Sequence, residues 1–158
     1  MSQFGSWNSL VLVIIYEYLR NDASPWYPYF KVLPTTFNTL MFWNSAELAE
    51  LQGSAVLDKI GKSEAEEGWK ITIIPFMVGH PALFPVAEDS ADSTFVQLAH
   101  MAGSLIMAYA FDLGKSEESD EDSFIEDDEE DPAKGMVPFA DMLNADADRN
   151  NVSRSTFS

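Results

Sequence analysis

The feature that most constrains the fold of this chain is a run of acidic residues in its C-terminal third. Residues 116–131, "SEESDEDSFIEDDEED", hold 11 of the 26 acidic residues and none of the 9 basic ones. Such a run cannot bury enough apolar surface to offset the entropy lost on ordering, so we expect a disordered loop. The remaining sequence has a net charge of only −6. The extreme charge is therefore local, and it disfavours nucleic-acid binding and suits a basic protein partner.

The remaining composition is typical of one folded domain. A chain of 158 residues with 46% hydrophobic content can build its own core. The absence of cysteine excludes disulfides, thiolate zinc sites and thiol nucleophiles within this sequence. The two histidines, His80 and His100, lack a spacing typical of metal ligands, so we expect no metal site. Neither of the longest apolar runs reaches the ~20 residues of a membrane span, so we expect no membrane association.

The apolar pattern predicts a predominantly α-helical chain. A buried helix is expected from Trp7 to about residue 20, capped by Asn8 or Ser9. Ser24 followed by Pro25 is typical of the start of a short helix, here within 24–34.

Further helices are expected in three places, separated by irregular stretches. They lie at 44–62, with a weak point at Gly53, at 64–76, and at 93–113, the strongest helical pattern of the chain. Residues 35–43 favour extended or irregular backbone, and 79–85 form a proline-bounded turn.

The stretch that follows the acidic run raises a separate question. Pro138 is expected to begin a short helix over 138–144 that ends in Asn144. Asn is a poor residue inside a helix because its amide competes for backbone hydrogen bonds. From the residues alone, Asn144 is interpreted as a C-terminal cap.

Several segments of the chain, in this order and spacing, resemble one protein family. They are "SPWYPYFKVLP", "TLMFW", "ELAELQGS", "IIPFMVGHPALF", "GSLIMAYAF" and "MVPFADMLNADADRNN". Together they resemble the SET-domain protein-lysine N-methyltransferases of the plant Rubisco-methyltransferase class. The resemblance looks closest to the nuclear members that methylate the RelA transcription factor and the fungal members that methylate a ribosomal protein.

The resemblance implies a fold and a division of the chain. Residues 1–115 correspond to the helical insertion of a SET domain with its flanking segment, 116–133 to the acidic loop, and 134–158 to the start of the C-terminal core segment. The fold class expected is thus predominantly α, with a partial core of the α+β, β-clip-like SET fold. The family's glycine-bearing cofactor strand and its tyrosine-bearing downstream segment are not found in the sequence. We therefore expect a truncated middle part that is inactive alone.

The resemblance also implies S-adenosylmethionine as cofactor and assigns residues to it. Asn144 matches an Asn whose amide bonds the cofactor, a task that suits a group that both donates and accepts. Ala145 departs from the family's His, whose backbone contacts the adenine. Tyr109 matches a tyrosine that approaches the cofactor, although a core aromatic is the commoner role of such a residue. Trp43 and Asp112 match positions on the substrate side, although a buried Trp and an exposed Asp need no function.

The implied function is methylation of a lysine on a basic nuclear or ribosomal protein, such as a ribosomal protein, a histone or a transcription factor. A nuclear location, possibly with a cytoplasmic fraction, rests on the resemblance alone. A free lysine has a pKa near ~10.4, so the site must favour its neutral form, which an aromatic channel does. No carboxylate pair or metal is required. The alternative is a catalytically dead interaction module whose acidic loop binds basic partners.

Overall fold

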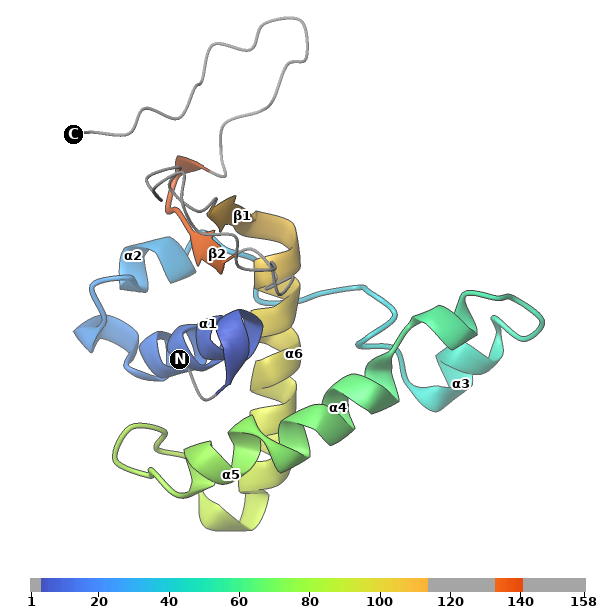
Figure 1. The fold of residues 1–158 in the computed structure, drawn as a ribbon, viewed down its shortest axis with the longest axis horizontal. Helices are drawn as coiled ribbons and strands as arrows, with labels where there is room; N and C mark the ends of the chain where they lie inside the picture. The colour runs from blue at the N-terminus through green and yellow to red at the C-terminus, as the bar shows by residue number, and fades with distance from the viewer. Residues whose placement is uncertain (1–3, 114–132, 141–158) are drawn as a thin grey trace, which may run out of the picture.

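The computed structural model describes residues 4–113 and 133–140 as a mostly helical assembly with one short β-ribbon (Figure 1). Its helices and strands, in chain order, are α1 (Gly5–Leu19), α2 (Tyr27–Phe30), α3 (Ser45–Ala49), α4 (Lys62–Ile71), α5 (Ile73–Val78), α6 (Ala91–Tyr109), β1 (Ala110–Leu113) and β2 (Ala133–Met136). Short 3-10 turns lie at Asn21–Ala23, Leu57–Lys59 and Glu88–Ser90. The predominantly helical class expected from the sequence is confirmed.

The hydrophobic core lies around α6, which runs through the centre of the molecule with α1, α4 and α5 against it (Figure 1). Its largest fully buried side chains are Phe95, Ile15, Ile73, Met77, Leu105, Ile106 and Val11. Each large apolar side chain buried in this way contributes ~1.5–3 kcal/mol relative to exposure. The core is therefore built mainly by the three most apolar helices of the sequence.

Helix α1 begins earlier than the sequence predicts. It starts at Gly5 after Phe4, without a side-chain cap, so the prediction that Asn8 or Ser9 caps it is wrong. The ring of Phe4 packs edge-on against Phe76, with 5.2 Å between the ring centres. This apolar contact extends the helix toward the N-terminus and replaces a polar cap as the anchor of its first turn.

Helix α2 begins later than the sequence predicts. Its first residue is Tyr27, so Ser24 and Pro25 do not act as N-cap and first helical residue. The Ser24 hydroxyl accepts a hydrogen bond from the Trp26 amide and donates one to Glu17. Ser24 therefore stabilises the turn before the helix instead of the helix itself.

The helix expected over 44–62 is largely absent. Helix α3 ends at Ala49, before Gly53, and Gly53 adopts a φ of +80°, a left-handed conformation that favours glycine. Asn44 caps α3: its side chain accepts from the amides of Ala46 and Glu47. The irregular backbone expected at 35–43 is confirmed.

The helix expected over 64–76 is broken in two at Thr72. Helix α4 ends at Ile71, and Thr72 adopts a φ of −111° and a ψ of −77° before α5 begins at Ile73. Pro75 explains the break, because its ring would clash with the Ile71 carbonyl and it has no N–H to donate to it. As the third residue of α5, Pro75 occupies a position whose N–H has no partner within a helix anyway. The turn expected after α5 is confirmed at His80–Phe84.

The helix expected over 93–113 ends four residues early. Helix α6 stops at Tyr109, and residues 110–113 form strand β1, which pairs antiparallel with β2. The apolar pattern cannot reveal this change because the partner strand lies 20 residues further along the chain. Residues 137–140 form a turn in which Phe139 has a φ of +69°, so no helix begins at Pro138 itself. The rest of that expected helix, and the acidic run 116–131, lie outside the described residues.

Candidate cofactor and substrate site

The change from helix to strand at the end of α6 positions two of the residues implicated by sequence. Tyr109 is the last residue of α6, and its half-buried ring packs at the edge of the core. Asp112 follows on β1 with its side chain 62% exposed. Because the backbone becomes extended at Ala110, with a ψ of 150°, the chain leaves the helix axis between the two residues. The junction thus presents an aromatic ring beside the core and a carboxylate in solvent.

Asp112 is paired across the ribbon with a lysine. Lys134 is its register partner on β2, and the Lys134 Nζ donates to Asp112 Oδ1 at 2.5 Å. Solvent-exposed pairs of this kind contribute only ~0–1 kcal/mol. Another cation can therefore replace Lys134 at little energetic cost, so Asp112 is suited to contact a basic substrate.

Trp43 lies in the irregular segment before α3. Its ring N–H donates to Asn38 Oδ1 at 3.0 Å, and its carbonyl accepts from Lys62 Nζ at 3.1 Å. Within the described part of the chain, these bonds join Trp43 to its own segment and to the first turn of α4. They do not bring it to Tyr109 or Asp112. Asn144 and Ala145, the other two positions implicated by sequence, lie outside the described residues.

A groove of about 810 Å³ lies between α4 and α6. Residues 37–41 close one side and the start of α1 closes the other. Its lining includes Trp7, Phe37, Met41, Trp69, Met107 and Ala108. A small residue on each helix, Gly68 on α4 and Gly103 on α6, leaves room between the two helices. The groove was not predicted from the sequence, and the small residues on α4 and α6 are the signal that could have indicated it.

The groove also contains a buried histidine that sequence analysis set aside. His100 is 6% exposed, its Nε2 lies 2.8 Å from Glu66 Oε1, and Trp69 packs edge-on against its ring at 5.0 Å. A carboxylate accepts hydrogen bonds, so in the neutral ring the proton lies on Nε2 and Nδ1 is an acceptor. Nδ1 is buried, and no partner for it is found among residues 4–113 and 133–140.

The described residues do not bring together a set of potential metal ligands. In the described ranges, no three His, Asp or Glu side chains are placed to hold an ion together. Likewise, no helix in these ranges is long and apolar enough to cross a bilayer. An aromatic ring and an exposed carboxylate are instead compatible with binding of a nucleoside and a cationic substrate. Three residues were implicated in cofactor binding, and among them the structure describes Tyr109. Its half-buried ring offers an apolar surface against which a nucleoside can pack.

Comparison with known proteins gives matches along almost the whole chain. The chain is 36% identical over 162 residues to Ribosomal lysine N-methyltransferase 4 of Saccharomyces cerevisiae, which covers 97% of this chain and 32% of that protein. It is 35% identical over 154 residues to human N-lysine methyltransferase SETD6, covering 94% of this chain and 30% of that protein. No protein-family model and no solved structure matches.

The chain is therefore a homologue of the SET-domain protein-lysine methyltransferases, and the family resemblance inferred from its motifs is confirmed. Within that family, the pea chloroplast ribulose-1,5-bisphosphate carboxylase/oxygenase large subunit N-methyltransferase matches only 35% of the chain, at 41% identity over 56 residues. The yeast and human relatives match far more of it. The chain spans about a third of the length of these two relatives.

Proposed function

We propose that this chain is part of an S-adenosylmethionine-dependent protein-lysine N-methyltransferase, with the α6–β1 junction facing the cofactor and substrate. The observation that carries the proposal is homology over 97% of the chain to a protein named as a lysine N-methyltransferase. In this proposal, the helices form the insertion of a SET domain, and the β1–β2 ribbon belongs to its core. Residues 134–158 continue that core beyond the acidic segment.

The proposed roles follow from the surroundings of each residue. S-adenosylmethionine, when bound, would supply a methyl group to a neutral lysine amine: the N–C bond forms as the C–S bond breaks, the thioether leaves, and the nitrogen loses a proton. The half-buried ring of Tyr109 offers an apolar wall that excludes water from the cofactor side. Exposed Asp112 attracts the basic surroundings of the target lysine, with Trp43 as a second substrate contact. Asn144 and the backbone of Ala145 hold the adenine end of the cofactor.

The proposed substrate is a basic protein, ribosomal or nuclear, and the proposed location is the nucleus, possibly with a cytoplasmic fraction. The net charge of −17 supports a basic partner because opposite charges speed association and suppress other partners. The names of the yeast and human relatives, one of which refers to a ribosomal target, are consistent with this choice.

Calorimetric titration of the 158-residue chain with S-adenosylmethionine tests the cofactor assignment. We expect saturable binding that Tyr109→Ala weakens about tenfold, because loss of an aromatic packing contact costs ~0.5–1.5 kcal/mol beyond its area. Tyr18→Ala is the matched control, since Tyr18 is a tyrosine on the surface of α1. Equal loss in both variants, or no binding by the native chain, would contradict the assignment.

A second candidate function is a non-catalytic module that binds basic proteins. The observation that favours it is the concentration of 11 acidic residues within residues 116–131. Because the 158-residue chain is expected to be inactive alone, cofactor binding rather than methyl transfer distinguishes the two functions. Saturable binding of S-adenosylmethionine supports the methyltransferase, whereas salt-sensitive binding of a basic ribosomal protein without cofactor binding supports the module.

A further inference from the structure

A second, smaller pocket lies between α1, α2 and β2, away from the groove described above. Its volume is about 140 Å³. It is lined by Leu10, Val13, Ile14, Glu17, Trp26, Tyr29, Phe30 and Met136. The lining thus combines aliphatic side chains with three aromatic rings and one carboxylate. Nothing in the proposed methyl transfer uses this pocket.

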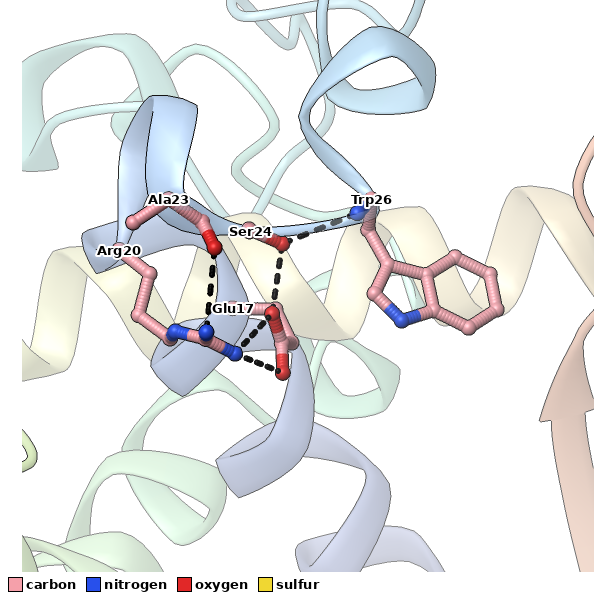
Figure 2. Close-up of polar contacts among 5 residues, drawn as sticks. All are labelled: Glu17, Arg20, Ala23, Ser24 and Trp26. Atoms are coloured by element: carbon pink, nitrogen blue, oxygen red, sulfur yellow. Dashed lines mark hydrogen bonds and ion pairs between the residues drawn. The ribbon is translucent and has the colours of Figure 1, made fainter.

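The carboxylate of this pocket is fixed in place by its neighbours. Arg20 Nη1 donates to both Glu17 oxygens, at 3.0 and 3.1 Å, and the Ser24 hydroxyl donates to Oε2 at 2.5 Å. Figure 2 shows Arg20 and Trp26 on opposite sides of the carboxylate, and Arg20 is not among the lining residues. The charged group that lines the pocket is therefore a carboxylate, whose charge is balanced by Arg20 on the side away from Trp26.

The three rings come from the short segment that begins at Trp26. Trp26 is 39% exposed, whereas Tyr29 is buried and packs against Phe30 with ring centres 6.4 Å apart. The face of an aromatic ring carries negative charge and attracts cations, and clusters of such rings recognise quaternary ammonium groups. The composition of the pocket thus favours a cation with an apolar surface.

The existing hydrogen bonds select among cations. The Glu17 oxygens already accept three hydrogen bonds, so an unmethylated ammonium, with three N–H donors, would lose water here without gaining enough acceptors. A fully methylated ammonium has no N–H group and needs only electrostatic and apolar contact. Its binding therefore does not require displacing Arg20 or Ser24.

The volume agrees with a group of this size. A water molecule occupies about 30 Å³ of liquid, so a space of about 140 Å³ holds roughly five groups of that size. A trimethylated nitrogen with the carbon that attaches it has five heavy atoms. Drug-sized ligands need ~300–1,000 Å³ and do not fit.

We propose that this pocket binds a methylated ammonium group, such as that of trimethyllysine or choline. The site goes beyond the proposed function, because it requires neither S-adenosylmethionine nor methyl transfer. A module of this kind would let the chain hold a methylated ligand beside the α6–β1 junction, because Met136 of the pocket pairs in register with Ala110 of β1.

Titration of the 158-residue chain tests the site, with the proton spectrum of the ligand as the readout for the native chain and for every variant. The probes are tetramethylammonium, acetylated and amidated trimethyllysine, choline, the unmethylated lysine analogue, and a neutral tert-butyl isostere, all at matched ionic strength. We expect saturable binding of the methylated cations and at least tenfold weaker binding of the lysine analogue and of the isostere. The tighter of trimethyllysine and choline identifies the natural source, and equal affinity shows that the ammonium alone is recognised.

Matched tryptophan variants locate the binding. Trp26→Ala should weaken binding about tenfold and Trp26→Phe should recover part of the loss, because the ring face carries the attraction. Trp7→Ala is the control, since Trp7 lines the groove between α4 and α6 and not this pocket. Absence of saturable binding, equal binding of the neutral isostere, or no effect of Trp26→Ala would overturn the proposal. Cofactor binding is measured separately, so failure of the methyltransferase proposal would leave this result interpretable.

Discussion

The packed helices α1, α5 and α6 differ sharply from the segment between residues 34 and 61, which we name the arm. The packed helices supply most of the buried side chains, including Ile15, Ile73 and Phe95. No residue whose exposure is described in the arm is buried. In Figure 1, the arm carries α3 away from α1 and α2. The two regions thus depend on different forces within one chain.

Local polar bonds determine the conformation of the arm. Asn44 and Glu47 form a capping box at the start of α3, and Trp43 is bonded to Asn38 and Lys62. Ring contacts join the arm to the core: Phe42 stacks on Phe37 at 5.3 Å and lies 5.9 Å from His100. The arm should therefore open locally at lower free energy than the core, since it has few buried apolar contacts.

The largest effect is expected in the core. Phe95→Ala removes a side chain that is 1% exposed and that packs edge-on against Phe84, so it should lower the free energy of unfolding by ~3–5 kcal/mol. Leu48→Ala, in the arm, should cost less than ~1 kcal/mol because its side chain is only partly covered. Urea denaturation followed by circular dichroism compares the two. Similar losses of unfolding free energy in the two variants would show that the arm contributes to global stability as much as the core does.

A smaller loss is expected where α1 meets α2. Ser24→Ala removes the hydroxyl that donates to Glu17 and accepts from the Trp26 amide, in a side chain that is 4% exposed. The unfolding free energy should fall by ~1–3 kcal/mol because buried partners are left unsatisfied. Ser63→Ala, at an exposed serine of α4, is the control and should change it little. An unchanged free energy of unfolding in Ser24→Ala would mean that water replaces the hydroxyl.

The capping box of the arm allows a test of local stability. Asn44→Ala should destabilise α3 by ~1 kcal/mol and Asn44→Gly by only a few tenths. The amides of Ala46 and Glu47 should exchange with solvent correspondingly faster, while the urea midpoint of the core stays nearly unchanged. A fall in that midpoint as large as for Ser24→Ala would refute the independence of the arm.

The smallest effect is expected at the ribbon. Lys134→Ala removes the exposed pair with Asp112 and should cost at most ~1 kcal/mol. The difference from the native chain should vanish near ~1 M salt, where electrostatic screening acts within ~3 Å. Thermal unfolding at low and high salt measures it. A larger, salt-independent loss would indicate that the lysine stem, not its charge, stabilises the ribbon.

The sequence predicted the long apolar helices correctly. It did not predict helix ends that depend on strand pairing or on a local backbone feature. The positions of α1 and α6 follow from the apolar runs around Ile15 and Phe95. The end of α6 could not be predicted, because β1 forms only through pairing with β2. The break at Thr72 was predictable in principle from Pro75, whose ring acts on the residue four positions earlier. Within the arm, Gly53 was recognised as a weak point, but the helix ends before it.

The candidate site was predicted unevenly for similar reasons. Family resemblance indicated Tyr109 and Asp112, and the structure places both at one junction. It also indicated Trp43, whose described bonds lie elsewhere, while Asn144 and Ala145 remain predictions. The groove around His100 was missed because it depends on how α4 and α6 pack, which periodicity within one helix does not encode. A buried histidine paired with a glutamate 34 positions away leaves no local pattern.

The β1–β2 ribbon has a consequence for how this chain can vary. Because Leu113 and Ala133 are register partners, the stretch that joins them has its two ends held together by the ribbon. Each doubling of the length of a closed loop costs only ~0.6 kcal/mol. Insertions and deletions there should therefore accumulate with little penalty, leaving Tyr109 and Asp112 where they are. This is the point at which orthologues can diverge in length and acidity without losing the fold.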